Sequence, residues 1–257
     1  MKIKKLFNLK GKTALVTGGS QGIGKAISLA LAEYGADLVI NYRSDKKLAE
    51  QTEKEIISNG GRCWLIECDI SRLDSAETIF SFLRNNNISP DILVLNASVQ
   101  YRKEWDEVTS EEFEDQINTN FRASLFLIQK MYPSMQEKNW GRIVTVGSVQ
   151  QSRPHQQMIV YAASKMAQLS MVKNLAPQFA PFGVTINNLA PGAIKTGRNE
   201  EVLKDEEYKK ITENKIPSGY VGEPADCAAT ALLLCTDAGR YITGQDIFID
   251  GGMGLNF

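Results

Sequence analysis

The stretch TALVTGGSQGIG, residues 13–24, joins an apolar run directly to a glycine-rich turn. The segment that follows has apolar residues at the spacing of one helix face: Ile23, Ala26, Ile27, Ala30, Leu31 and Tyr34. A tight strand-to-helix turn needs positive φ angles, and a backbone that approaches a phosphate closely needs missing side chains, so glycine suits both. The stretch therefore predicts a strand, a turn and a helix whose N-terminus binds the pyrophosphate of a dinucleotide. By themselves the glycines are also compatible with a simple sharp turn, because their spacing departs from GxGxxG.

The same alternation of short apolar runs and helical patterns continues along the chain. The runs rich in β-forming residues are residues 13–17, 37–41, 63–67, 92–96, 142–148, 184–189 and 246–250. Their continuous apolar character predicts a parallel sheet covered on both faces, and helical crossovers between them give a doubly wound α/β (Rossmann) fold. We expect seven strands in a single domain over residues 1–257, with functional residues beyond the carboxyl ends of the strands.

One polar stretch interrupts this alternation between the sixth and seventh expected strands. Residues 195–218 read KTGRNEEVLKDEEYKKITENKIPS and are highly charged. A segment in this position either covers the substrate or forms a solvated helical excursion, and the sequence leaves both interpretations open.

The balance of charges excludes several classes of partner. The 257 residues include 29 Lys and Arg and 30 Asp and Glu, with a net charge of −1. No overall field attracts nucleic acid or an anionic membrane, so we expect a small-molecule partner. The longest apolar run, around Ala228–Cys235, is about half the ~20 residues of a membrane-spanning helix. Because the N-terminal segment also lacks the apolar stretch of a signal peptide, we expect a cytoplasmic protein.

The cysteines do not form a pattern that binds metal. Cys63, Cys68, Cys227 and Cys235 contain no CxxC pair, and the single His155 cannot complete a usual zinc site with them. We expect four buried thiols and no metal.

The end of the second expected strand bears on the choice of cofactor. Sites that prefer NAD usually place an acidic residue there, but the chain reads Asn41, Tyr42, Arg43, Ser44. Arg43 can pair with a 2′-phosphate, which favours NADP over NAD. Alternatively, Arg43 begins an exposed helix and pairs with Asp45 or with nothing.

Tyr161 and Lys165 are candidates for the chemistry. They are four residues apart in a segment of helical character, so both side chains lie on one face. A nearby ammonium favours the ionised phenol and brings tyrosine into range for proton exchange with an alcohol. Ser148, at the carboxyl end of the fifth expected strand, can hydrogen-bond the reacting oxygen. Without Ser148, a tyrosine and a lysine at this spacing more often lie on an exposed helix face.

Together these motifs resemble the short-chain dehydrogenase/reductase family. The loop TGxxxGxG is present at residues 17–24, CDI at 68–70 matches the segment that contacts adenine, and NAS at 96–98 stands where NAG is usual. A second departure is Tyr220, which stands where the family's PxxRxG segment has arginine. The resemblance implies that the following residues bind the cofactor: Gly18, Ser20, Gln21, Gly22, Ile23, Gly24, Tyr42, Arg43, Ser44, Asp69, Ile70, Asn96, Ala97, Ser98, Tyr161, Lys165, Pro191, Gly192, Ile194 and Thr196.

The resemblance also implies a role for Asn120 and an oligomeric state. In the family the matching asparagine bends its helix and holds a water that leads from the lysine to solvent. From the residues alone, Asn120 is a satisfied core asparagine on an apolar stripe that includes Phe113, Ile117, Phe121, Ser124, Leu125 and Ile128. The family is commonly homotetrameric, with the helices of Asn120 and Tyr161 in one interface and the last strand in another.

The implied activity is hydride transfer between nicotinamide and a carbonyl or alcohol carbon. Tyr161 would protonate the carbonyl oxygen, Ser148 would hydrogen-bond it, and Lys165 would bind the nicotinamide ribose. The polar loop QQSRPHQQM, residues 150–158, contains Gln150 and His155 and either faces a hydroxylated substrate or is a solvated loop.

Three functions remain to be separated. A sugar or polyol is slightly favoured as substrate. A 3-oxoacyl-thioester reductase is the alternative, and its acyl-carrier-protein partner would need a basic patch for which Arg102, Lys103 and Arg198 are the candidates. A non-catalytic dinucleotide-binding sensor or scaffold is the alternative of another class, against which the intact Asn120, Ser148, Tyr161 and Lys165 set argues.

Overall fold

Seven parallel strands form the sheet of the computed structural model, which describes residues 2–200 and 204–255. The strands are β1 (Thr13–Thr17), β2 (Asp37–Tyr42), β3 (Cys63–Glu67), β4 (Ile92–Leu95), β5 (Gly141–Val146), β6 (Val184–Pro191) and β7 (Asp246–Ile249). Their spatial order is β3-β2-β1-β4-β5-β6-β7, and every neighbouring pair is parallel. The sheet predicted from the apolar runs is confirmed.

The order of the strands reverses at β1. β1 pairs with β2 on one side and with β4 on the other, so the chain crosses over the sheet after β3. In open parallel sheets, ligands bind in the crevice beyond the carboxyl ends of the strands at such a reversal. β4 and β5 end earlier than predicted, because Asn96 turns to bond the β1 turn and Ser148 caps a 3₁₀ turn.

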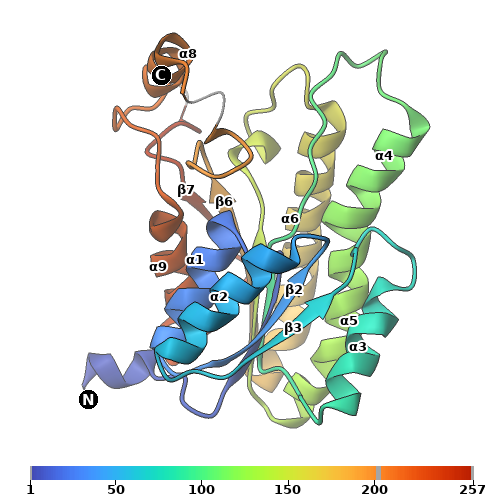
Figure 1. Ribbon diagram of the computed structural model, residues 1–257, viewed down its shortest axis with the longest axis vertical. Helices are drawn as coiled ribbons and strands as arrows, with labels where there is room; N and C mark the ends of the chain where they lie inside the picture. Colours follow the sequence, from blue (N-terminus) through green and yellow to red (C-terminus); the bar gives the residue numbers. More distant parts are fainter. Residues whose placement is uncertain (1, 201–203, 256–257) are drawn as a thin grey trace.

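Helices cover both faces of the sheet (Figure 1). One layer contains α1 (Gly22–Glu33), α2 (Lys46–Ser58) and α9 (Pro224–Cys235), and the other contains α3 (Ser75–Asn85), α5 (Ala123–Glu137) and α6 (Ile159–Phe179). α4 (Ser110–Ile117) leads into α5, and α8 (Glu206–Glu213) lies above the carboxyl edge of the sheet (Figure 1). The short helices are η1 (Ile3–Phe7), η2 (Asn118–Arg122), η3 (Val149–Gln151), η4 (Ala180–Phe182) and η5 (Asp237–Gly239).

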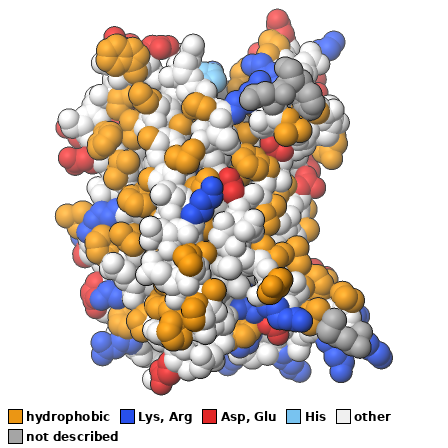
Figure 2. Space-filling model, turned by 180° about the vertical axis from the view of Figure 1, so that it is seen from behind, with side chains coloured by type: hydrophobic (Ala, Val, Ile, Leu, Met, Phe, Trp, Pro, Cys, Tyr) orange, Lys and Arg blue, Asp and Glu red, His pale blue; other side chains and the backbone are white. Residues whose placement is uncertain are grey.

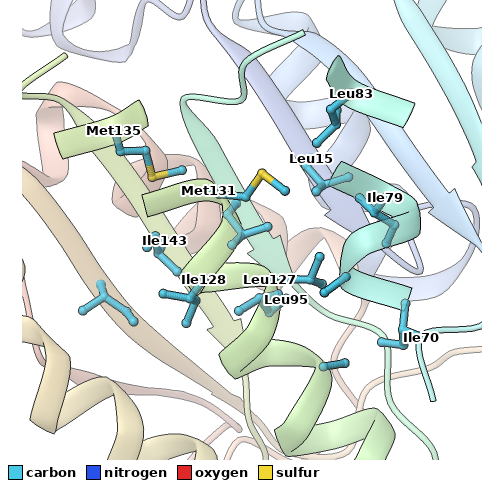
Figure 3. Close-up of a cluster of buried hydrophobic side chains, with 14 of the residues drawn as sticks. Leu15, Ile70, Ile79, Leu83, Leu95, Leu127, Ile128, Met131, Met135 and Ile143 are labelled. Carbon is cyan, nitrogen blue, oxygen red and sulfur yellow. The ribbon is translucent and has the colours of Figure 1, made fainter. Parts of the chain in front are cut away.

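Each face of the sheet has its own apolar core. Leu15 of β1 faces the core formed with α3, α5 and α6, whereas its neighbour Val16 faces the core formed with α1 and α9. Figure 3 shows the first core, where Met131 on α5 and Ile79 on α3 approach Leu15. Successive residues of a strand point to opposite faces, so burial on both faces requires the continuous apolar runs seen in the sequence.

A π-helical turn, η2, joins α4 to α5 and changes which residues face inward. Gln116, Thr119 and Asn120 are buried, whereas Phe113 is 49% exposed. The apolar stripe expected through Phe113 is therefore wrong at that position. The wider turn shifts the helical phase, and the core side of the segment becomes polar.

Two further expectations concern membranes and metals. Within the described ranges no helix has the length and apolar character to cross a membrane. The same residues contain no group of three His, Cys, Asp or Glu side chains positioned to hold a metal ion. Cys68, Cys227 and Cys235 are buried, but Cys63 is only half-buried, because β3 is an edge strand.

Candidate active site

The glycine-rich turn between β1 and α1 presents the N-terminus of α1 at the carboxyl edge of the sheet. Gly18 (φ +60°) and Gly22 (φ +52°) adopt backbone angles that favour glycine. A Cβ atom on Gly24 would overlap the Gly18 carbonyl and the Asn96 amide, so only glycine allows this close packing. Gln21, at the N-cap position, makes no capping hydrogen bond. The first N–H groups of α1 are not capped by a side chain, and the turn fits a pyrophosphate.

Asn96 fixes this turn to the end of β4. Its Nδ2 donates to the carbonyl oxygens of Thr17, at 3.0 Å, and Gly18, at 3.1 Å. The Thr17 hydroxyl accepts hydrogen bonds from the backbone N–H groups of Asn96 and Ala97. The side-chain amide of Asn96 therefore fixes the glycine-rich turn to the end of β4.

Arg43 stands exposed at the end of β2. Among the described residues it forms no ion pair, and Asp45 instead caps α2 by accepting from the Leu48 N–H. The neighbouring Tyr42 donates a hydrogen bond from its hydroxyl to Glu67. The alternative in which Arg43 pairs with Asp45 does not occur, and the guanidinium remains available to an anion.

A cleft of about 720 Å³ lies along the carboxyl edge and brings most of the expected site residues together. Figure 2 shows a hollow at the top of the molecule, with the histidine colour and Lys and Arg side chains at its rim. The expected residues that line it are Gly18, Ser20, Gln21, Gly22, Ile23, Tyr42, Arg43, Asp69, Ile70, Asn96, Ala97, Ser98, Ser148, Gln150, His155, Tyr161, Pro191, Gly192, Ile194 and Thr196. Gly24, Asn120 and Lys165 lie buried behind its wall, and Ser44 is exposed outside it.

Tyr161 and Lys165 occupy the first turns of α6, and both are buried. The Lys165 Nζ lies 5.7 Å from the centroid of the Tyr161 ring and donates to the Val146 carbonyl at 2.7 Å. Burial, and to a smaller extent the positive charge of Arg198, lowers the pKa of Lys165 to about 7. A lysine in this state gains or loses its charge near neutral pH.

A chain of buried hydrogen bonds leads from Lys165 to Asn120. Lys165 Nζ approaches the Gln168 Oε1 at 3.5 Å, Gln168 Nε2 donates to the Ser124 hydroxyl at 2.9 Å, and that hydroxyl donates to the Asn120 carbonyl at 3.3 Å. Sequence reasoning missed Gln168 and included Ser124 only as part of an apolar stripe. The signal that could have identified Gln168 is its polar side chain, three positions after Lys165 on a helix expected to be buried.

The Asn120 side chain itself joins two elements. Its Oδ1 accepts from the Val99 N–H at 2.9 Å, and its Nδ2 donates to the Val99 carbonyl and to the Ser164 hydroxyl, both at 3.0 Å. Both amide hydrogens are therefore used within the protein. Asn120 fixes the loop after β4 against α6 while remaining fully buried.

The polar loop after β5 is held to the cleft by its own hydrogen bonds. Ser148 Oγ accepts from the Gln150 N–H at 3.2 Å, and Gln150 Oε1 accepts from the His155 N–H at 2.6 Å. His155 is half-buried, and burial together with the charges of Arg102 and Lys215 lowers its pKa. The loop connects the Ser148 hydroxyl to the mouth of the cleft.

The segment 195–218 borders the opposite side. Tyr208, Ile211, Thr212 and Lys215 line the cleft, and no residue of α8 is buried. The sequence analysis did not single out these four residues, because they belong to no motif. Only the charge of the segment and its position between two strands indicated that it lies near the site. Residues 201–203 of the expected cover lie outside the described residues.

Ser98, one of the two departures from the family pattern, contacts this segment. Arg198 Nη2 donates to the Ser98 carbonyl at 2.8 Å and to the Ser98 hydroxyl at 3.1 Å. A glycine at this position would lack the second of these bonds. Tyr220, the other departure, is 59% exposed and outside the cleft.

Comparison with known proteins finds similar enzymes over nearly the whole chain. A family model described as enoyl-(acyl carrier protein) reductase matches residues 18–254. The 3beta-hydroxysteroid dehydrogenase 1 of Eggerthella lenta is 34% identical over 96% of this chain and 95% of that protein. The L-rhamnose-1-dehydrogenase of Scheffersomyces stipitis is 31% identical over 96% and 98%, respectively. The crystal structure of a 3-oxoacyl (acyl-carrier-protein) reductase from Agrobacterium tumefaciens C58 with NADP bound has a TM-score of 0.93 and 32% identity, covering 98% of this chain and 97% of that one.

Proposed function

This chain belongs to the short-chain dehydrogenase/reductase family, and we propose that it transfers a hydride between NADP(H) and a small polar substrate such as a sugar or polyol. Its membership makes it an NAD(P)-dependent oxidoreductase that acts on CH–OH or carbonyl groups. The observation that carries the proposal is the single cleft, in which the dinucleotide turn, Ser148 and Tyr161 share one space with the polar side chains of Gln150 and His155.

The proposed roles follow from the chemistry of each side chain. When bound, the nicotinamide supplies or accepts the hydride. Tyr161 donates a proton to the carbonyl oxygen in reduction and accepts it from the alcohol in oxidation, and Ser148 hydrogen-bonds the same oxygen. Lys165 binds the nicotinamide ribose and, when charged, favours the ionised form of Tyr161. Asn120 would anchor the water from which the proton is replaced.

Arg43 supports the choice of NADP(H). It is exposed at the end of β2, lines the cleft and has no carboxylate paired with it among the described residues. A guanidinium in this position can bind a 2′-phosphate through two parallel hydrogen bonds, whereas a ribose hydroxyl offers no charge. The relative with NADP bound agrees with this choice.

The test is a fluorescence titration with NADPH and NADH, followed by a panel of sugars, polyols and carbonyl compounds read at the nicotinamide absorbance. Tyr161→Phe is expected to lower kcat by about a hundredfold to ten-thousandfold, because the proton donor is lost, while NADPH still binds. Tyr34→Phe, on the exposed end of α1, is the matched control. Turnover by Tyr161→Phe at the wild-type rate would refute the assignment.

A 3-oxoacyl-thioester reductase is the second candidate. One of the relatives carries this activity in its name, and Arg102 and Arg198 line the mouth of the cleft. Lys103, the third basic residue considered, is instead paired with Glu112 at 2.7 Å and lies outside the cleft. Turnover of acyl thioesters but not of polar substrates would select this candidate, and binding of NADPH without any turnover would select a non-catalytic role.

We further propose that the protein is a homotetramer and that residues 195–218 cover the substrate. Apolar side chains are exposed on the helices near the site, including Phe126 of α5 and Met166 of α6. Edge strand β7 exposes Phe248, and Tyr241 nearby is fully exposed. Such surfaces are typical of interfaces between copies. Light scattering coupled to size exclusion measures the mass, and a monomer would refute the tetramer.

A further inference from the structure

We infer that the substrate carries a carboxylate in addition to its hydroxyl groups, and that Arg102 and Lys215 bind this carboxylate at the mouth of the cleft. The inference rests on the proposed function and specifies the chemical class of its substrate as a sugar acid.

The charges of the lining residues differ between the two ends of the cleft. The cofactor end holds Asp69 together with Arg43. The substrate end, beyond Ser148 and Tyr161, is lined by the cations Arg102, Arg198 and Lys215, and none of its described lining residues is acidic. A neutral sugar gives no reason for this one-sided charge, whereas an anion is complementary to it.

Arg102 is positioned by the protein but has unused donors. Its Nε donates to Gln157 Oε1 at 3.0 Å, and its Nη2 lies 3.2 Å from His155 Nε2. The Gln157 N–H already faces the other ring nitrogen of His155 at 3.1 Å. A neutral imidazole accepts a hydrogen bond at only one of its two nitrogens. Only one of these two donors, the Arg102 guanidinium or the Gln157 N–H, is therefore satisfied by His155. A carboxylate would provide the acceptors that the guanidinium lacks.

Lys215 reaches the same region from the other wall. Lys215, Arg102 and His155 line the same cleft. Burial and the positive charges of Arg102 and Lys215 lower the pKa of His155, and the carboxylate of Glu104, which accepts a hydrogen bond from Gln157, raises it. No described residue forms an ion pair with Lys215. Glu104 bonds Gln157 and not the guanidinium of Arg102 or the ammonium of Lys215. An anion bound between these two cations would be attracted by both.

The contacts also connect this region to the reacting group. Ser148 accepts from the N–H of Gln150, Gln150 accepts from the N–H of His155, and His155 contacts Arg102. The side chains along this path are an amide and an imidazole, which can hydrogen-bond hydroxyl groups. A hydroxylated carboxylate offers hydrogen-bond partners to this amide and this imidazole, and the apolar chain of an acyl thioester does not.

The experiment compares matched pairs of an aldonate and its alditol, beginning with D-gluconate and D-glucitol, together with a 3-oxoacyl thioester. Binding to the enzyme–NADP⁺ complex is followed by fluorescence, and turnover by nicotinamide absorbance. The variants are Arg102→Gln and Lys215→Gln, with Lys103→Gln as control because Lys103 is paired with Glu112 outside the cleft.

We expect an aldonate to bind at least about tenfold more tightly than its alditol at low ionic strength, with the difference reduced by salt. Arg102→Gln should raise KM for the aldonate by about tenfold to a hundredfold with little change in kcat. The charged hydrogen bond that is lost stabilises the bound substrate and the transition state equally. Lys103→Gln should retain the wild-type preference.

Two results would overturn the inference. The first is equal or tighter binding of alditols or thioesters than of every aldonate, and the second is a preference for aldonates that Arg102→Gln and Lys215→Gln both leave unchanged. In either case turnover of any polar substrate would leave the proposed oxidoreductase function standing. Loss of turnover with all substrates, with NADPH still bound, would instead refute the proposed function.

Discussion

Replacing Lys165 by methionine is expected to stabilise the fold near neutral pH while it abolishes turnover. The Lys165 side chain is 1% exposed, and burial lowers its pKa from 10.5 to about 7. At about 1.4 kcal/mol per pKa unit, this change corresponds to about 5 kcal/mol of destabilisation when the folded protein holds the charge. Methionine has a similar length and no charge, but loses the bonds to Val146 and Gln168, worth about 1–2 kcal/mol. We expect a net gain of about 2–4 kcal/mol in unfolding free energy.

The sign of the pH dependence follows from proton binding. Because the folded pKa of Lys165 lies below its unfolded value, the unfolded chain binds more protons between pH 7 and 10.5. The wild-type stability contributed by this residue therefore rises with pH through that window, and the full penalty applies below pH 7. The advantage of Lys165→Met should be present at pH 7 and below. At pH 10.5 the charge penalty is nearly gone, so the lost bonds should leave the variant about 1–2 kcal/mol less stable than wild type.

The assay is urea unfolding of wild type and variant at the two ends of this window. One protein concentration is used throughout, because the proposed association of copies would make stability depend on concentration. Lys173→Met is the matched control, since Lys173 is an exposed residue on the same helix. It should show no advantage that depends on pH. A Lys165→Met variant that is less stable than wild type at pH 7, or whose advantage is the same at both pH values, would refute the reasoning.

Three further changes test other parts of the site. Arg43→Ala should weaken NADPH binding by about tenfold to a hundredfold and leave NADH binding unchanged. The control Lys46→Ala, outside the cleft, should affect neither cofactor. Equal weakening of both cofactors by Arg43→Ala would contradict a 2′-phosphate contact. Gly24→Ala should destabilise the protein by about 1–3 kcal/mol and weaken NADPH binding, because its Cβ overlaps the turn; a titration identical to wild type would show that the turn adapts. Gln168→Met should lower the pKa of Lys165, because an acceptor near its Nζ is lost, and should move the pH profile of kcat/KM the same way. An unchanged profile would show that Gln168 has only a structural role.

The sequence predicted those parts of the molecule that depend on local pattern. Leu15 and Val16 point to opposite faces of β1, and both are apolar because helices cover both faces of the sheet. The resulting unbroken apolar run can be recognised in a short window of the sequence. The turn at Gly18 and Gly22 was predictable for the same reason, since its backbone angles restrict the residue type locally. The strand ends were less accurate, because side-chain bonds such as that of Asn96 decide where pairing stops.

The remaining parts depend on contacts between distant residues. Ser98 meets Arg198 across 100 residues of sequence, and Arg102 meets His155 across 53. Neither pairing leaves a periodic signal, so the sequence could only suggest that each residue was near the site. The π-helical turn before α5 is a similar case, because its phase shift depends on Asn120 bonding Val99 and Ser164 on other elements.

The two sides of the cleft differ in how firmly the fold fixes them, and this difference bears on how the family varies. Gly24 and Asn120 are fully enclosed by contacts, so substitutions there disturb the core. α8, which bears Tyr208 and Ile211 and precedes Lys215, has no buried residue, and surface substitutions of that kind usually change stability by less than about 0.5 kcal/mol. Relatives 31–34% identical to this chain are named for a sugar and a steroid, although they match it over nearly their whole length. With the proposed roles, substitutions on the exposed wall would change the choice of substrate, whereas the proposed cofactor and proton-transfer residues would remain constrained by folding.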